Sequence, residues 1–296
     1  MAEGGGGANT AGANTAGANT AGVNTAGVNS GGSPSTGGQP EGEGGAGGAP
    51  FIDPDSGPFQ VLVVSAAATY VHESIPNAVA LVAELGQTAD AALPSFAKPG
   101  SQFETTVLAT AAEVDAITPQ FLADYRVLFF AHTTGSVFSS RANGTDIMEA
   151  VEAFMNAGGG WVGINGTIEL EAAGMWPWCH DNLIGSLGGA HNVVVADVLW
   201  TAVATTFNHP VTRDIPTPWA CDDEFYTLSR DPSNQGFSIL GTRASNGFPV
   251  VWAKEFGAGG RSVFTTLGHE VATYSDANFK KLMLQSILWA ANRMEE

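Results

Sequence analysis

Three of the six histidines in the chain closely follow short apolar segments that have the length of buried strands. They are His72, His132 and His269. Histidine titrates near neutral pH, so it suits proton transfer, and its neutral ring is a common metal ligand. A single histidine is more often a packing residue or a helix cap than a catalytic residue. Three that converge on one edge of a sheet would predict a functional site.

The elements that position these histidines can be read from the pattern of apolar residues. Residues 59–64 form a continuous apolar segment, which is typical of a strand buried on both faces. A helix is expected next, with Ser74 as its N-cap, Pro76 in its first turn and Gly86 as the residue that closes it. Further strands are predicted at 105–109, 126–131, 161–164, 238–240, 249–253 and 262–266, and further helices at 119–123, 145–157 and 277–292.

This alternation predicts an α/β fold with three layers, α/β/α, of the flavodoxin-like kind. We expect a mainly parallel sheet covered by helices on both faces. Ligands of such sheets bind beyond the carboxyl ends of the strands. Thr134 and Asn165 also follow predicted strands, so we expect them at the same edge as the three histidines.

Residues 1–57 have a different composition from the rest of the chain. Residues 8–32 contain five tandem copies of a five-residue unit, Ala-Asn-Thr-Ala-Gly or a close variant. Such a segment lacks the apolar surface that would offset its ordering entropy. We therefore expect a disordered linker at 1–57 and one domain at 58–296.

A flexible tether suggests display of the domain away from an anchor. We expect an exported protein of the periplasm or the bacterial cell surface, with a secretion signal and a lipid anchor preceding this sequence. A low-complexity extension on a cytoplasmic protein is the alternative.

The charge of the chain narrows the classes of partner. Its formal net charge is −18, and Lys98 is the first of only eleven basic residues. Such a surface repels phosphate backbones and anionic lipids, so nucleic acid is not expected as a partner. No apolar segment approaches the roughly 20 residues that span a bilayer, so we expect no transmembrane segment. A small molecule or a glycan is the expected ligand, and the oligomeric state is left open.

Two cysteines, Cys179 and Cys221, are too few for a disulfide framework or a structural zinc site. The simpler interpretation is two buried free thiols. One disulfide between them is the alternative.

Several motifs, in order along residues 59–293, together resemble the ThuA-like (trehalose utilisation) family. They are His-Glu-Ser-Ile at 72–75, Tyr-Arg-Val-Leu-Phe-Phe at 125–130, Thr-Thr-Gly at 133–135, Gly-Gly-Gly-Trp-Val-Gly-Ile at 158–164, Asn-His-Pro-Val-Thr at 208–212, Asp-Glu-Phe-Tyr at 223–226, Pro-Val-Val-Trp at 249–252, and Gly-Arg-Ser-Val-Phe at 260–264 leading to Gly-His at 268–269. The resemblance implies a class I glutamine amidotransferase-like fold and a role in sugar metabolism.

One position departs from the family pattern. The family usually has a histidine where this chain has Asn165. The position corresponds to the turn where true amidotransferases carry their nucleophilic cysteine. An asparagine is neither a nucleophile nor a general base. We therefore expect no glutamine amidotransferase activity.

The strand ends and the resemblance together supply the candidate site. Adjacent carboxylates can position or deprotonate sugar hydroxyls, so Asp223 and Glu224 join His72 and His269 as candidate catalytic residues. The candidate substrate-binding residues are Glu73, His132, Thr134, Asn165, His209, Tyr226 and Trp252. No cofactor is predicted. A divalent metal held by the acids with His72, His209 and His269 is an open alternative, because no ligand spacing in the sequence indicates one.

Four functions stay open at this point. The first is an enzyme acting on a carbohydrate, such as a keto-sugar or a glycoside. The second is a carbohydrate-binding module without catalysis. A metal-dependent hydrolase of another substrate and a surface scaffold without a small ligand are the others.

Overall fold

The computed structural model describes residues 57–206 and 208–295. The predicted linker at 1–57 lies outside these residues except for Gly57, so it stays a prediction. Within the described residues, no helix has both the length and the apolar composition needed to cross a bilayer.

One sheet of nine strands forms the centre of the domain, in the order β2-β1-β3-β4-β9-β8-β7-β5-β6. The strands are β1 Phe59–Val64, β2 Phe103–Leu108, β3 Val127–Ala131, β4 Gly160–Ile164, β5 Gly188–Trp200, β6 Trp219–Leu228, β7 Ser238–Arg243, β8 Pro249–Glu255 and β9 Arg261–Thr265.

The first half of the sheet matches the predicted topology. Strands β2, β1, β3, β4 and β9 are all parallel to one another. Every residue of β3, β4 and β9 is buried, as expected for strands covered on both faces. The predicted boundaries of these strands agree with the structure to within two residues.

The prediction of a mainly parallel sheet is wrong, because four of the eight strand pairings are antiparallel. The connections explain why. Parallel neighbours need a crossover of a dozen or more residues, whereas β7, β8 and β9 follow one another through short turns. Strands β5 and β6, which the sequence analysis did not predict, then extend the sheet beyond β7.

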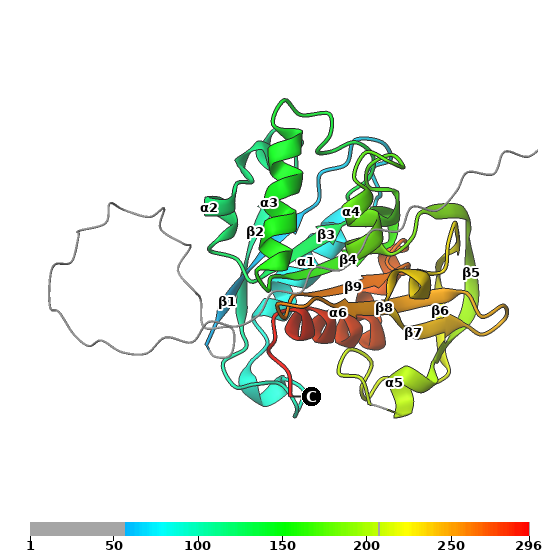
Figure 1. Cartoon of the computed structure of the whole chain (residues 1–296). Helices are drawn as coiled ribbons and strands as arrows, with labels where there is room; N and C mark the ends of the chain where they lie inside the picture. The colour runs from blue at the N-terminus through cyan, green and yellow to red at the C-terminus, as the bar shows by residue number, and fades with distance from the viewer. Residues whose placement is uncertain (1–56, 207, 296) are drawn as a thin grey trace, which may run out of the picture. The chain divides into compact units, whose positions relative to one another are not determined.

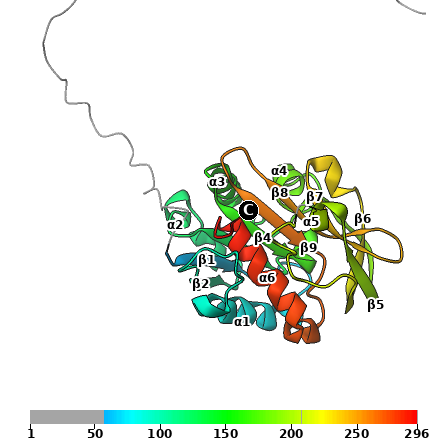
Figure 2. The ribbon, with the colours of Figure 1, turned by 90° about the horizontal axis from the view of Figure 1, so that it is seen from below.

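Helices cover both faces of the sheet, and α3 and α6 lie on opposite sides of it (Figure 1). The helices are α1 Ile75–Gly86, α2 Pro119–Leu122, α3 Gly144–Asn156, α4 Pro177–Cys179, α5 Ala202–Thr206 and α6 Ala277–Ala290. Helices α1 and α6 lie beside each other on one face (Figure 2). Along β1, Val61 and Val63 pack with α1 and α6, and Leu62 and Val64 pack with α3, as the period of two requires.

Helix α1 begins where expected and extends through Gly86, and the two residues predicted at its ends act differently. Ser74 occupies the N-cap position without a side-chain capping bond. Its hydroxyl donates instead to the carbonyl of Gly268. Gly86 is the last helical residue, and a Cβ there would lie 2.2 Å from the carbonyl oxygen of Phe103. Close packing against β2, not a left-handed turn, therefore requires this glycine.

Candidate functional site

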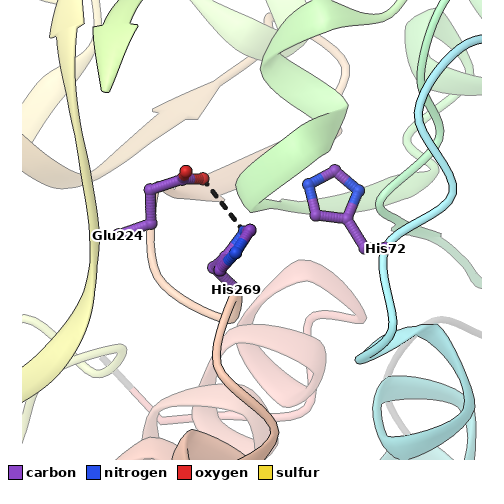
Figure 3. A group of neighbouring side chains, drawn as sticks. All are labelled: His72, Glu224 and His269. Atoms are coloured by element: carbon purple, nitrogen blue, oxygen red, sulfur yellow. Dashed lines mark ion pairs between the residues drawn. The ribbon is translucent and has the colours of Figure 1, made fainter. Parts of the chain in front are cut away.

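Three side chains from distant parts of the chain meet at the carboxyl edge of the parallel strands (Figure 3). His72 lies in the loop after β1, His269 in the loop after β9, and Glu224 on β6. One nitrogen or oxygen atom from each lies within 4.8 Å of the corresponding atom of the other two. We refer to His72, Glu224 and His269 as the triad.

The Glu224 carboxylate is the centre of this arrangement and is only 5% exposed. Its Oε2 lies 3.2 Å from Nδ1 of His269 and accepts a hydrogen bond of 3.2 Å from Nδ2 of Asn165. Its Oε1 lies 3.7 Å from Nε2 of His191. Both carboxylate oxygens therefore face histidine nitrogens, and a side-chain amide holds one of them in place.

Asn165 links the triad to the parallel strands. It follows the last residue of β4 and has a positive φ of 36°. Its Nδ2 also donates to the carbonyl of Thr266, at 2.8 Å. Asn165 therefore holds Glu224 against the end of β9, which is a positioning role that its amide can perform without titrating.

The His72 ring packs among other rings. Its centroid lies 4.5 Å from that of His132 and 5.3 Å from that of His269. Burial lowers the pKa of His72 to about 4, His269 adds to the effect, and the charge of Glu224 opposes it. Burial likewise holds the pKa of His132 well below its usual value. Both rings are therefore neutral imidazoles at neutral pH.

His132 packs against the His72 ring and is itself held by hydrogen bonds. Its Nε2 lies 2.8 Å from the Tyr274 hydroxyl and 3.3 Å from that of Ser74, and both hydroxyls donate to the carbonyl of Gly268. Because each hydroxyl has a single proton, Nε2 of His132 is assigned as the donor in this network. His132 therefore ties the loop after β3 to the start of α1 and to the loop that carries His269.

Asp223 faces the backbone of the same loop. Its carboxylate accepts hydrogen bonds from the backbone N–H groups of Glu224, Gly268, His269 and Glu270 and from the Thr273 hydroxyl. Burial raises the pKa of Asp223, and these hydrogen bonds oppose the rise. The side chain is fully buried. The structure therefore gives Asp223 a positioning role and leaves Glu224 as the carboxylate that faces the histidines.

Two of three further predicted residues contact the surroundings of the triad. Tyr226 is two residues beyond Glu224 on β6, and its ring packs on His191 at 4.7 Å. Burial raises the pKa of Tyr226, and the charge of Glu224 adds to the effect. Thr134 donates to the carbonyl of Tyr70 at 2.9 Å and so fixes the segment before His72. Glu73 is exposed.

Two predicted substrate-binding residues have packing contacts instead. His209 packs on Trp289 of α6 at 5.1 Å, and its Nδ1 accepts from the backbone N–H of Val211. Burial lowers the pKa of His209 to about 4, with Arg261 and Arg213 adding to the effect. Trp252 is fully buried on β8 and donates to the carbonyl of Ile184 at 2.7 Å. Neither residue belongs to the triad.

Two residues of the site were not predicted from the sequence. His191 lies on β5, where glycines and exposed side chains hide the strand pattern. Gly166 packs directly under His72, and a Cβ at position 166 would lie 2.4 Å from Cε1 of that histidine. The glycine after the end of β4 was visible in the sequence, but only the fold shows that His72 lies over it.

The cysteines belong to different core clusters, Cys179 to the one that contains α3 and Cys221 to the one that contains α6. Both are free and buried, so the alternative of one disulfide is wrong.

Solved structures of low sequence identity share this fold. A structure described as a ThuA-like protein from Bacteroides uniformis is 18% identical, covers 81% of this chain and 94% of its own, and has a TM-score of 0.59. One from Parabacteroides merdae, described in the same words, is 18% identical, covers 81% and 92%, and has a TM-score of 0.57. A cytoplasmic protein from Salmonella typhimurium is 11% identical, covers 80% and 100%, and has a TM-score of 0.53.

No curated protein matches the chain significantly. The ThuA family, described as trehalose utilisation, matches residues 60–290, which contain all nine strands except the first residue of β1 and all of the candidate site. The chain belongs to the ThuA family.

Proposed function

We propose that this protein is an enzyme that acts on a carbohydrate by acid–base chemistry at the triad. The observation that carries the proposal is the buried Glu224 carboxylate, 3.2 Å from Nδ1 of His269 and beside the neutral ring of His72. The family description, trehalose utilisation, supports a sugar as the substrate class. Trehalose, a related glycoside or a keto-sugar fits this description.

Glu224 is the proposed base. It accepts a proton from a carbon beside a keto group, and the electron pair of that C–H bond moves to the keto oxygen to form an enolate. His269 donates a proton to that oxygen, and its Nδ1 takes the proton back from Oε2 of Glu224, 3.2 Å away, so the net step moves one proton from carbon to oxygen. Asp223 holds His269 in position through the backbone, and Asn165 orients Glu224.

Exposed apolar side chains surround the triad and suit a sugar ring. Tyr70 is 56% exposed, and its ring packs edge-on against His72 at 4.6 Å. Val193 lies directly opposite Glu224 in the β5–β6 pairing, so it shares a face with that residue, and Val195 follows it at 73% exposure. Apolar and aromatic surfaces of this kind pack against the C–H faces of pyranose rings.

We infer that amidotransferase chemistry is absent. Such chemistry needs a reactive thiolate beside a base. Asn165 occupies the turn after β4, and burial raises the pKa values of the Cys179 and Cys221 thiols.

A carbohydrate-binding module without turnover is the second candidate. The chain has an amide, Asn165, where relatives usually have a titratable ring, and this favours binding without chemistry. Display on a tether at the cell surface would suit either candidate.

The test uses trehalose, glucose and their oxidised keto forms with the full chain in D2O, followed by NMR. We expect solvent deuterium in the sugar or a new product with the wild type, and a fall of about 100-fold or more in Glu224→Gln. Glu149→Gln, an exposed carboxylate on α3, is the matched control.

Calorimetric titration of each sugar completes the experiment. Binding without turnover would replace the enzyme proposal with the binding module. Equal turnover in Glu224→Gln and the wild type would remove Glu224 from the mechanism, and no binding of any sugar would overturn both candidates.

A further inference from the structure

We propose that the triad is a binding site for one divalent transition-metal cation, with Zn²⁺, Mn²⁺ or Fe²⁺ as the chemical class. The cation would present open coordination positions to a substrate oxygen. The identity of that oxygen rests on the proposed function above, whereas the metal site itself does not.

The buried charge of Glu224 favours a cation at the triad. A buried carboxylate is ordinarily paired with a lysine, an arginine or a metal ion. Glu224 is 5% exposed, and its side-chain partners in the described residues are Asn165, Tyr226, His191 and His269. None of these carries a permanent positive charge. A divalent cation at the triad would supply one.

The donor atoms of the triad favour a transition metal. Two imidazoles with one carboxylate suit borderline transition metals and are unlike the all-oxygen sites of Ca²⁺ and Mg²⁺. Three protein ligands are typical of catalytic sites, which keep further positions for water or substrate, whereas structural zinc sites use four.

The distances between the donor atoms of the triad are close to those around a tetrahedral ion. A tetrahedral ion with bonds of about 2.05 Å holds its ligand atoms about 3.3 Å apart. Nδ1 of His269 and Oε2 of Glu224 already lie 3.2 Å apart. The donor atom of His72 is within 4.8 Å of the other two, so a shift of at most about 1.5 Å in its ring completes the site. Among the residues that the structure describes, Nδ1 of His72 is buried without a hydrogen-bond partner.

The surroundings are built as metal sites require. Ligand residues are oriented by a second layer of hydrogen bonds, and loss of such a bond weakens metal binding. Asn165 holds the Oε2 atom of Glu224, Asp223 holds the backbone of His269, and Gly166 leaves room for the His72 ring. His191, at 3.7 Å from Oε1 of Glu224, lies at the border of the site and is not one of the three ligands.

The open coordination positions of the cation suggest how a sugar would bind. A vicinal diol or a hydroxyketone offers two oxygen atoms to one cation. The exposed side chains of Tyr70 and Val193 lie next to the triad and would contact the sugar ring. The cation would then polarise a sugar oxygen as a Lewis acid, and Oε1 of Glu224, which is not needed as a ligand atom, would remain the proton acceptor.

The first experiment uses metal alone. The full chain is treated with a chelator, dialysed and titrated with Co²⁺, whose visible absorption reports nitrogen and oxygen coordination, and then with Zn²⁺ in competition. We expect one ion per chain. We expect at least a 100-fold loss of affinity in His72→Gln, Glu224→Gln and His269→Gln, and no change in Glu149→Gln. Circular dichroism and thermal melting identify any variant that fails to fold.

Gly166→Ala keeps the test decisive if all three ligand variants unfold. It leaves every ligand in the chain but forces the His72 ring to move, so it should weaken Co²⁺ binding and shift the absorption bands. No Co²⁺ spectrum with the wild type, or equal affinity in the wild type and the triad variants, would overturn the metal site.

The sugar assay separates the two proposals. Sugar turnover that survives complete removal of metal would overturn the Lewis-acid role of the cation and leave the proposed function standing. Stoichiometric metal binding by a protein that neither binds nor converts any sugar would leave the metal site standing and overturn the proposed function.

Discussion

The backbone N–H of His269 donates a hydrogen bond of 2.9 Å to Oδ1 of Asp223, the residue adjacent to Glu224 on β6. Neighbouring residues of one strand point to opposite faces. Asp223 uses this geometry to hold the backbone of the loop after β9, and Glu224 faces the side chain that the loop presents. Two adjacent acids thus perform two tasks, one of positioning and one of chemistry.

Replacement of Asp223 by Asn should therefore damage both stability and binding. The amide group keeps the size of the side chain but loses its charge and sets an N–H group against N–H donors. We expect unfolding to become easier by about 3 kcal/mol, and Co²⁺ affinity to fall with it. Asp222→Asn, at an exposed neighbour, should change stability by less than about 0.5 kcal/mol. Denaturant unfolding and the metal titration measure both effects. Equal stability of the two variants would contradict the positioning role.

Gly166→Ala should separate site geometry from stability. A Cβ at this position reaches 2.4 Å from the His72 ring, so the ring must move. The backbone has no positive φ at residue 166, so alanine is compatible with it. We expect at least a tenfold loss of Co²⁺ affinity, with less than about 1 kcal/mol of change in stability. Gly257→Ala, in open space, is the control. Wild-type affinity in Gly166→Ala would show that this glycine does not set the His72 position.

His209 should make the protein sensitive to acid. Its pKa is about 4 in the folded chain because of burial and the nearby Arg261, and about 6.5 when unfolded. Above pH 6.5 the ring is neutral in both states and contributes nothing. As the pH falls from 6.5 towards 4, the unfolded chain binds the proton first, so stability is lost in this window.

His209→Gln removes this contribution. Between pH 7 and pH 5 the variant should lose about 1–2 kcal/mol less stability than the wild type. His72 and His132 titrate in the same sense in both proteins, so the difference isolates His209. Urea unfolding at the two pH values measures it. An equal loss in both proteins would contradict the depressed pKa.

The cysteines should be unreactive in the native protein. Burial raises the pKa of both thiols, which keeps them protonated and shielded at pH 8. A thiol reagent such as Ellman's should detect no thiol in the native chain and two in guanidinium. Detection of none after unfolding would indicate the disulfide instead.

The sequence determined the local elements and one edge of the site. Continuous apolar segments such as 127–131 are buried on both faces wherever they pair, so their strands could be predicted from composition alone. Because the carboxyl ends of parallel strands meet at one edge, His72, His132, Asn165 and His269 could be expected together there. The family motifs added Glu224 and Tyr226 without showing where β6 lies.

Only the tertiary structure decided the second half of the sheet and the division of roles. Strand β5 is half exposed, and its pairing with β6 and β7 joins residues that are distant in the sequence. Such pairing depends on register between strands, which no local pattern contains. That register brings Glu224 to His269, turns Asp223 onto the loop backbone and adds His191, whereas His209 and Trp252 are used in packing. Residue type and spacing therefore identified the candidates, and contacts between distant strands selected among them.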